Sequence, residues 1–178
     1  MEEMNELVKQ RIDKLNAIKE IGIEPYGRRF DKPVNIEILL KESKEGDSVQ
    51  TAGRITALRE HGKSSFFDLR DSSGRAQVYI KADIVGKDIY ANIFKKLDIG
   101  DILGVKGKFF KTRTGEITIN AEKITLLAKG LRPLPEKWHG LKDVEIRYRQ
   151  RYVDLIVNDD VRNVFRLRTK IVSKIRSF

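Results

Sequence analysis

The sequence contains no cysteine and only two histidines among its 178 residues. A chain without cysteine forms no disulfide framework and no thiolate metal site, and two histidines give little basis for a histidine-based one. No apolar run approaches the roughly 20 residues that a membrane-spanning helix requires. The opening residues, MEEMNELVKQRIDK, also lack the apolar region of a signal peptide. We therefore expect a cytoplasmic protein that has neither a metal site nor a membrane partner.

The sequence also lacks the patterns that usually carry catalysis. It has no glycine-rich phosphate loop, no histidine at a plausible spacing from a nucleophile and no acidic cluster suited to Mg²⁺. It does carry 36 Lys and Arg residues against 26 Asp and Glu, which gives a net charge of +10 and favours a polyanionic partner. Basic proteins without a nucleic-acid partner also occur, so charge alone leaves both possibilities open. The residues predict a binding protein with no catalytic residue.

The first part of the chain reads as one helix and a connector. Apolar residues at spacings of three and four, separated by charges, predict an amphipathic helix over residues 4–21 that ends at Gly22. Residues 22–35 contain Gly and Pro and show little periodicity, so we interpret them as a connector that wraps the body.

Strand patterns begin at Ser48. The turns DSSG at 71–74 and TRTGE at 112–116 each offer a glycine where a positive φ is needed, and residues 86–100 show helical spacing. Three strands, a helix and two strands form the order of the OB-fold, a small barrel whose second and third strands commonly bind single-stranded nucleic acid. The predicted strands are residues 48–60, 63–71, 75–81, 101–112 and 116–129.

A second change of composition comes at residues 131–141, LRPLPEKWHGL, which predict a stiff extended linker. The residues after it read as helices, and the last helix has a suitable cap in Asn158 or Asp159. This last helix has an apolar face and nothing after it to bury that face. We therefore expect one complete domain and the beginning of another. The predicted parts are an N-terminal helix and connector (1–35), an OB-fold domain (36–130), the linker (131–141) and the start of a further domain (142–178).

Phe66 and Phe67 are consecutive strand residues, so their side chains point to opposite faces. One of them is expected in the barrel core and the other outside. An outward phenylalanine on this face is suited to stacking on a base, although it could instead pack under the N-terminal helix or the connector. We favour stacking, because the neighbours of this pair offer what base recognition needs.

Those neighbours are Arg59, Gln77 and Glu116. Together they supply the donors and acceptors that read the Watson-Crick edge of a single-stranded base. Lys111 and Arg113, in the hairpin between the fourth and fifth strands beside Glu116, are the first candidates for phosphate contacts, and Lys63 is another.

The cluster RYRQRY at 147–152 leaves its role open. Arg147 and Arg151 lie four residues apart on one helix face, so they could pair with carboxylates across a domain junction or contact the inside of an RNA.

Several stretches resemble the class II lysine-tRNA ligases of the bacterial type, and the resemblance covers nearly the whole chain. The stretches LLAKGLRPLPEKWHGL and RYRQRYVDLIVN are the most specific, because the related ligases for aspartate and asparagine share the OB-fold but differ at the linker. The stretches are GKSSFFDLRDSSGRAQVYI, FKKLDIGDILGVKGKFFKTRTGEITI, LLAKGLRPLPEKWHGL and RYRQRYVDLIVN.

The resemblance implies that the OB-fold domain binds the uridine-rich anticodon of lysine tRNA. By motif position, Phe66 resembles the family's stacking aromatic and Gln77 and Glu116 its base-contacting residues, while Arg59 matches a less regular stretch. Residues 165–178 resemble the opening helix of motif 1, the element of the family's homodimer interface.

The parent enzymes make lysyl-adenylate from lysine and ATP with Mg²⁺ and then transfer lysine to the tRNA. The arginines of motifs 2 and 3 have no counterpart in this sequence, so the resemblance implies that these 178 residues alone are inactive and need no cofactor. The alternative is a free-standing OB-fold module that binds RNA, or serves as an assembly factor, without ligase activity.

Overall fold

The computed structural model describes residues 2–27, 29–31, 33–135, 141 and 143–178, with side chains from residue 6 onward. The chain forms two compact units, residues 1–133 and 134–178, which we treat separately. Of the predicted linker at 131–141, residues 136–140 lie outside the described residues.

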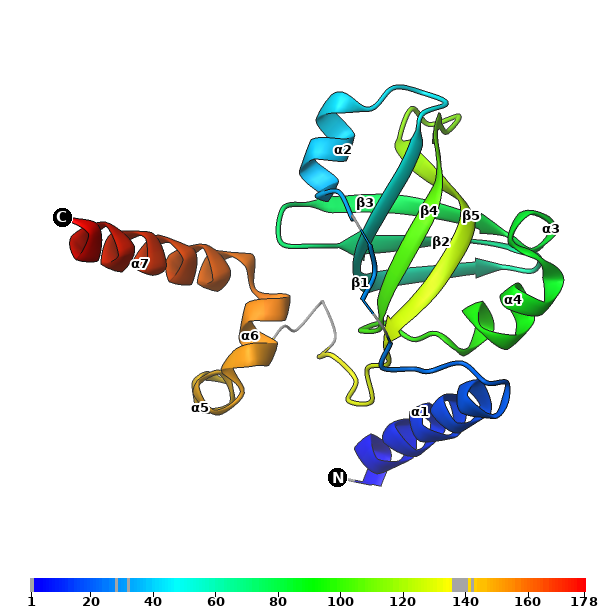
Figure 1. The fold of residues 1–178 in the computed structure, drawn as a ribbon. Helices are drawn as coiled ribbons and strands as arrows, with labels where there is room; N and C mark the ends of the chain where they lie inside the picture. The colour runs from blue at the N-terminus through cyan, green and yellow to red at the C-terminus, as the bar shows by residue number, and fades with distance from the viewer. Residues whose placement is uncertain (1, 28, 32, 136–140, 142) are drawn as a thin grey trace. The chain divides into compact units, whose positions relative to one another are not determined.

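The first unit is built around five strands that close into a barrel in the order β1-β2-β3-β5-β4 (Figure 1). Strands β3 and β5 pair in parallel and the other neighbours are antiparallel. This confirms the predicted five-stranded barrel with flanking helices. The strands are β1 (Ser48–His61), β2 (Ser64–Arg70), β3 (Arg75–Lys81), β4 (Ile102–Lys111) and β5 (Ile117–Ala128).

Alternation along these strands places one set of side chains inside the barrel and the other set outside. Glycine lets two strands approach closely where a side chain would collide. A Cβ at Gly107 would lie 2.1 Å from the carbonyl oxygen of Asn120 on β5. The fully buried strand residues of the core include Ile55, Phe67, Leu69, Val78, Ile80, Leu103 and Ile119.

The single helix predicted between the third and fourth strands is wrong in detail. The segment forms α3 (Ala82–Val85), α4 (Lys87–Asn92) and a 3-10 turn, η1 (Phe94–Lys96). The break after α4 has a packing reason, because it directs the fully buried Phe94 ring into the core. Its centroid lies 5.6 Å from that of Phe67 and 5.1 Å from that of Tyr90.

A helix that we did not predict, α2 (Ile36–Glu42), begins against the β2–β3 hairpin. The amide of Ile36 donates to Asp71 Oδ2 at 2.9 Å, and the amide of Glu37 donates to Ser73 Oγ at 3.1 Å. These bonds satisfy amides that a helix start leaves without helical partners. Burial raises the pKa of Asp71, but the bonds from Ile36, Ser73 and Gly74 outweigh it, and the pKa is lowered overall.

The same hairpin corrects our expectation of a positive φ at Gly74. Gly74 is not among the positive-φ glycines, whereas Gly115 in the other hairpin has φ 86° as predicted. The Asp71 side chain accepts from the amides of Ser73 and Gly74 at 2.6 and 2.8 Å and closes the turn instead.

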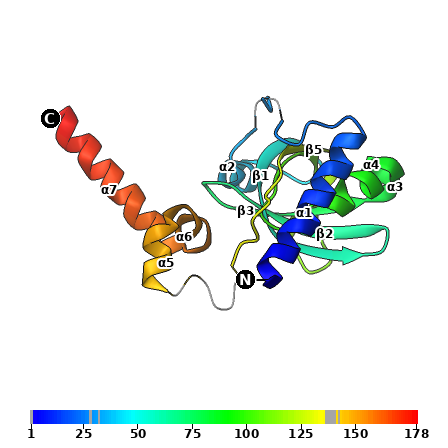
Figure 2. The same ribbon diagram turned by 90° about the horizontal axis from the view of Figure 1, so that it is seen from below.

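The predicted N-terminal helix is α1 (Glu2–Glu20), and Gly22 follows it with φ 78° as expected. It lies beside the α4 segment of the barrel (Figure 2). Ile18 on α1 is fully buried in the common core, and Arg11 donates to the carbonyl oxygens of Gly130 and Ile99 at 2.7 and 3.1 Å. The helix is therefore part of the barrel unit.

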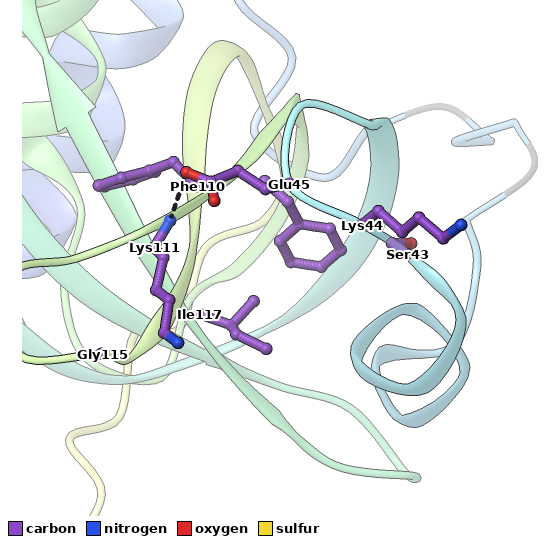
Figure 3. A pocket seen from close by; sticks show the side chains of 8 residues that line it. Ser43, Lys44, Glu45, Phe110, Lys111, Gly115 and Ile117 are labelled. Carbon is purple, nitrogen blue, oxygen red and sulfur yellow. Dashed lines mark hydrogen bonds between the residues drawn. The ribbon is translucent and has the colours of Figure 1, made fainter.

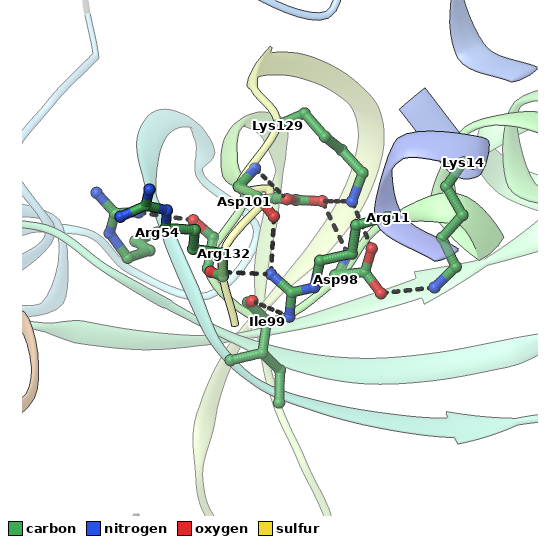
Figure 4. A network of polar contacts seen from close by, with 10 residues as sticks. Arg11, Lys14, Arg54, Asp98, Ile99, Asp101, Lys129 and Arg132 are labelled. Atoms are coloured by element: carbon green, nitrogen blue, oxygen red, sulfur yellow. Dashed lines mark hydrogen bonds and ion pairs between the residues drawn. The ribbon is translucent and has the colours of Figure 1, made fainter. Parts of the chain in front are cut away.

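An ion network fixes this attachment (Figure 4). The side chain of Lys129 is fully buried, and its Nζ lies 2.5 Å from Asp98 and 2.8 Å from Asp101. Lys14 on α1 reaches Asp98 at 2.5 Å from the other side. Burial raises the pKa of Asp98, but hydrogen bonds and charges from Lys129 and Lys14 outweigh it and lower the pKa overall.

The described residues of the second unit form three helices: α5 (Val144–Arg149), α6 (Arg151–Val157) and α7 (Asp159–Ser177). Asn158 stands at the N-cap position of α7, but its side chain donates to Asp154 at 2.6 Å and makes no cap bond. Arg147 also binds Asp154, at 3.1 Å, and Arg151 forms a second ion pair with it. The two arginines thus meet a carboxylate of their own unit.

Within the described part of α7 the apolar face is exposed. Its exposed residues include Val164, Leu167, Ile171, Val172 and Ile175.

Candidate nucleic-acid interface

A row of side chains crosses the outer face of the barrel at the level of Phe66. In the strand register, Phe66 on β2 lies opposite Arg59 on β1 and Tyr79 on β3. The ring centroids of Phe66 and Tyr79 are 4.9 Å apart, and Tyr79 is 6.1 Å from Phe110 on β4. Phe66 is half-buried and Phe67 fully buried, which agrees with the facing predicted from the sequence.

We did not predict Tyr79 or Phe110 at this site from the sequence. Tyr79 stands two residues after Gln77, so strand alternation alone places it on the same face. Phe110 could not be placed that way, because its position depends on which strands are neighbours in the barrel. Together with Phe66, these two residues form a surface of three aromatic rings.

The predicted base-contacting residues Gln77 and Glu116 lie together. Gln77 Nε2 donates to Glu116 Oε2 at 2.9 Å, and Gln77 Oε1 accepts from the hydroxyl of Thr118 at 2.8 Å. Gln77 opposes Thr118 in the parallel β3–β5 pair. The amide is therefore held in one orientation beside the aromatic row, which leaves a defined set of donors and acceptors for a ligand.

Arg59 is tied to a residue that sequence reasoning missed. Its Nη2 lies 3.1 Å from Asp68 Oδ1, and Arg75 Nη1 lies 3.4 Å from Asp68 Oδ2. The side chain of Asp68 is only 4% exposed, although it belongs to the outer face. The signal that could have found it is its spacing, two residues after Phe66, in the stretch FFDLR.

The residues predicted to contact phosphate lie in two different places. Lys111 and Arg113 stand at the β4–β5 hairpin and Lys63 in the β1–β2 turn, all with exposed side chains. Lys111 borders a pocket of about 260 Å³ between this hairpin and the segment before β1 (Figure 3). The pocket also takes in Lys44, Glu45, Phe110 and Ile117. It continues the aromatic row, because Phe110 belongs to both.

None of the helices described is both long and apolar enough to cross a membrane. Among the side chains described, no group of three or more His, Cys, Asp and Glu is placed to hold a metal ion.

Comparison with known proteins agrees with this geometry. Residues 49–127 match the family described as "OB-fold nucleic acid binding domain". The chain is 53% identical to a lysine-tRNA ligase of Moorella thermoacetica, with 100% of this chain and 37% of that protein covered. It is 54% identical to one of Thermoanaerobacter sp. (strain X514) and 49% to one of Thermosipho africanus, covering 99% and 98% of this chain and 36% of each relative. The chain is therefore similar to lysine-tRNA ligases over its whole length, spans little more than a third of the length of these relatives, and matches the OB-fold family at residues 49–127.

Proposed function

We propose that the outer face around Phe66 binds the anticodon loop of a lysine tRNA and is the tRNA-reading part of a lysine-tRNA ligase. The observation that carries the proposal is the juxtaposition of the Phe66–Tyr79 ring pair with the hydrogen-bonded Gln77 and Glu116. Single-stranded RNA is recognised by stacking splayed bases on aromatic rings while polar side chains read their edges. This face supplies both kinds of contact.

Each residue has a defined part in this proposal. Phe66 stacks a base, while Gln77 and Glu116 read its edge, with Arg59 as a further donor. Lys111 and Arg113 hold phosphates on one side of the row, and Lys63 does so at the β1–β2 turn. Edge contacts give base preference and phosphate contacts give affinity that falls with salt.

The ligase chemistry itself is proposed only for the longer relatives. The described residues offer no cluster of ligands for Mg²⁺, so no step of ATP-dependent adenylation is assigned to them. We expect residues 1–178 alone to show no lysine-dependent pyrophosphate exchange. A tRNA partner would place the protein in the cytoplasm.

The exposed apolar face of α7 is proposed to pair with a second copy of the chain.

Chemical-shift mapping tests the location of the RNA site. The chain is titrated with a lysine anticodon stem-loop while its backbone amide NMR signals are followed. We expect the largest shifts at Phe66, Gln77 and Lys111, and none in α1 beyond those caused by salt. Shifts spread evenly over the basic residues of the chain would contradict a defined site.

A further inference from the structure

Asp68 is an acidic residue on a face that is otherwise suited to binding a polyanion. It lies on β2 opposite Gln77 of β3, two residues after Phe66 and on the same face of the strand. Its side chain is 4% exposed, whereas the side chains of Arg59 and Arg75 are 48% and 60% exposed. The carboxylate therefore lies beneath two guanidinium groups that reach the solvent.

The ion pairs reach Asp68 from both neighbouring strands. Arg59 comes from β1 and binds Oδ1, and Arg75 comes from β3 and binds Oδ2. A buried charge is costly unless it is paired, so each arginine stabilises the carboxylate and is in turn held by it. Without this partner, the long arginine side chains would sample many rotamers at the surface.

The cluster of Arg59, Asp68 and Arg75 also determines which charge and which hydrogen-bond donors a ligand encounters. One carboxylate under two arginines leaves a net charge of +1, so the cluster attracts RNA although it contains an acid. A guanidinium has donors on all of its nitrogens, and only one nitrogen of Arg59 is engaged by Asp68. The other nitrogens of Arg59 keep their donors for a ligand, and Arg59 opposes Phe66 in the strand register.

We propose that Asp68 is a positioning residue for base choice: it orients Arg59, and with it Arg75, so that the guanidinium donors meet a base edge beside Phe66 and not any nearby phosphate. This inference rests on the proposed function. It assigns to Asp68 a part in specificity, and none in raw affinity.

The test compares Asp68→Asn with Asp83→Asn by titrating each with two anticodon stem-loops. Asp83 is a surface residue whose carboxylate lies 3.3 Å from Lys81, so its substitution changes the net charge equally, from +10 to +11. One loop carries the anticodon uridines and the other has them replaced. In wild type the ratio of the two affinities defines the uridine preference.

For Asp68→Asn we expect this preference to fall by about tenfold to a hundredfold, the value of a charge-assisted hydrogen bond. The affinity for the loop whose uridines are replaced should equal or exceed that of the wild-type chain. The plot of log affinity against log salt concentration for this loop should become steeper by about 0.7 for each arginine that now contacts a phosphate. Asp83→Asn should keep the wild-type preference. If Asp68 had only a structural role, Asp68→Asn would weaken binding to both loops equally and would leave the uridine preference unchanged.

An unchanged preference in folded Asp68→Asn would overturn the inference while leaving the proposed function standing. Absence of any uridine preference in wild type would instead count against the proposed function. If Asp68→Asn does not fold, the wild-type chain still provides a test through the side-chain NMR signals of its arginines. Slow rotation of the Arg59 and Arg75 guanidinium groups, relative to Arg113, supports the inference, and equal rotation of all three overturns it.

Discussion

Phe66 and Phe67 are consecutive residues of β2 whose rings lie on opposite sides of the barrel wall. Phe67 is fully buried, with its ring centroid 5.6 Å from that of Phe94. Phe66 is half-buried on the outer face, 4.9 Å from Tyr79. The same substitution at the two positions should therefore have different consequences.

We expect Phe67→Ala to lower the free energy of unfolding by about 3 to 5 kcal/mol, because it leaves a cavity in the core. Phe66→Ala should change the melting temperature little and weaken anticodon-loop binding by about 1 to 3 kcal/mol, the value of one stacked base. Thermal unfolding and RNA titration of both variants check this. Equal losses of stability with unchanged binding would mean that Phe66 is only a packing residue.

Gln77 and Lys111 should separate base choice from unselective affinity. Gln77→Ala removes an edge-reading amide and should reduce the uridine preference, with little change in salt dependence. Lys111→Ala should weaken binding to all loops alike and lower the salt slope by about 0.7. Titrations at several salt concentrations measure both quantities. A Gln77→Ala chain with the full uridine preference would remove Gln77 from the site.

The network around Lys129 predicts how acid affects the barrel unit. The pKa of Asp98 is lowered in the folded chain, so its stabilising contribution is complete above the unfolded value, about 3.9, and is lost as the pH falls through the lower folded value. Asp98→Asn should lower the urea midpoint at pH 7 and make the decline of the midpoint below pH 4 shallower. The surface variant Asp83→Asn serves as its control, and the same acid dependence in both variants would contradict the prediction.

The exposed apolar face of α7 predicts association. Ile171 and Ile175 lie one turn apart, and 51% and 71% of their surfaces are exposed. Replacing both with Glu should reduce self-association in sedimentation velocity, because apolar surface of this kind is covered by a partner when two chains meet. The control Lys170→Gln with Arg176→Gln changes the net charge by the same two units, from +10 to +8, and keeps Ile171 and Ile175. A wild-type chain that sediments as a monomer at all concentrations would refute this.

The barrel was predictable because its determinants are local. Alternation along each strand and glycine in the TRTGE turn specify where strands begin and end, and alternation alone separates Phe66 from Phe67. The start of α2 was not predictable in this way, because its amides are satisfied by Asp71 and Ser73, about 35 residues away in the chain. The break after α4 depends similarly on space in the core for Phe94.

The same distinction holds for the site. Phe66, Gln77 and Glu116 were proposed from residue type, strand position and family resemblance, and in the structure Gln77 and Glu116 are in contact. Phe110 and the Asp68 ion pairs depend on the closure of the barrel and the register of three strands, which no single segment encodes. The spacing of Asp68, two residues after Phe66, indicates that the two share a face, but nothing in the sequence alone indicates that this acid is buried.

A competition titration distinguishes a face that reads the uridines of a lysine anticodon from a surface that is merely basic. The 178-residue chain is bound to a labelled lysine anticodon stem-loop and challenged with unlabelled loops of equal length and charge, in which the uridines are retained or replaced by cytidines. Because both competitors carry the same phosphates, the +10 charge of the chain affects them equally. We expect the uridine loop to displace the label at a concentration at least tenfold lower than the cytidine loop. Displacement by both loops at equal concentrations would show that this face does not read uridines.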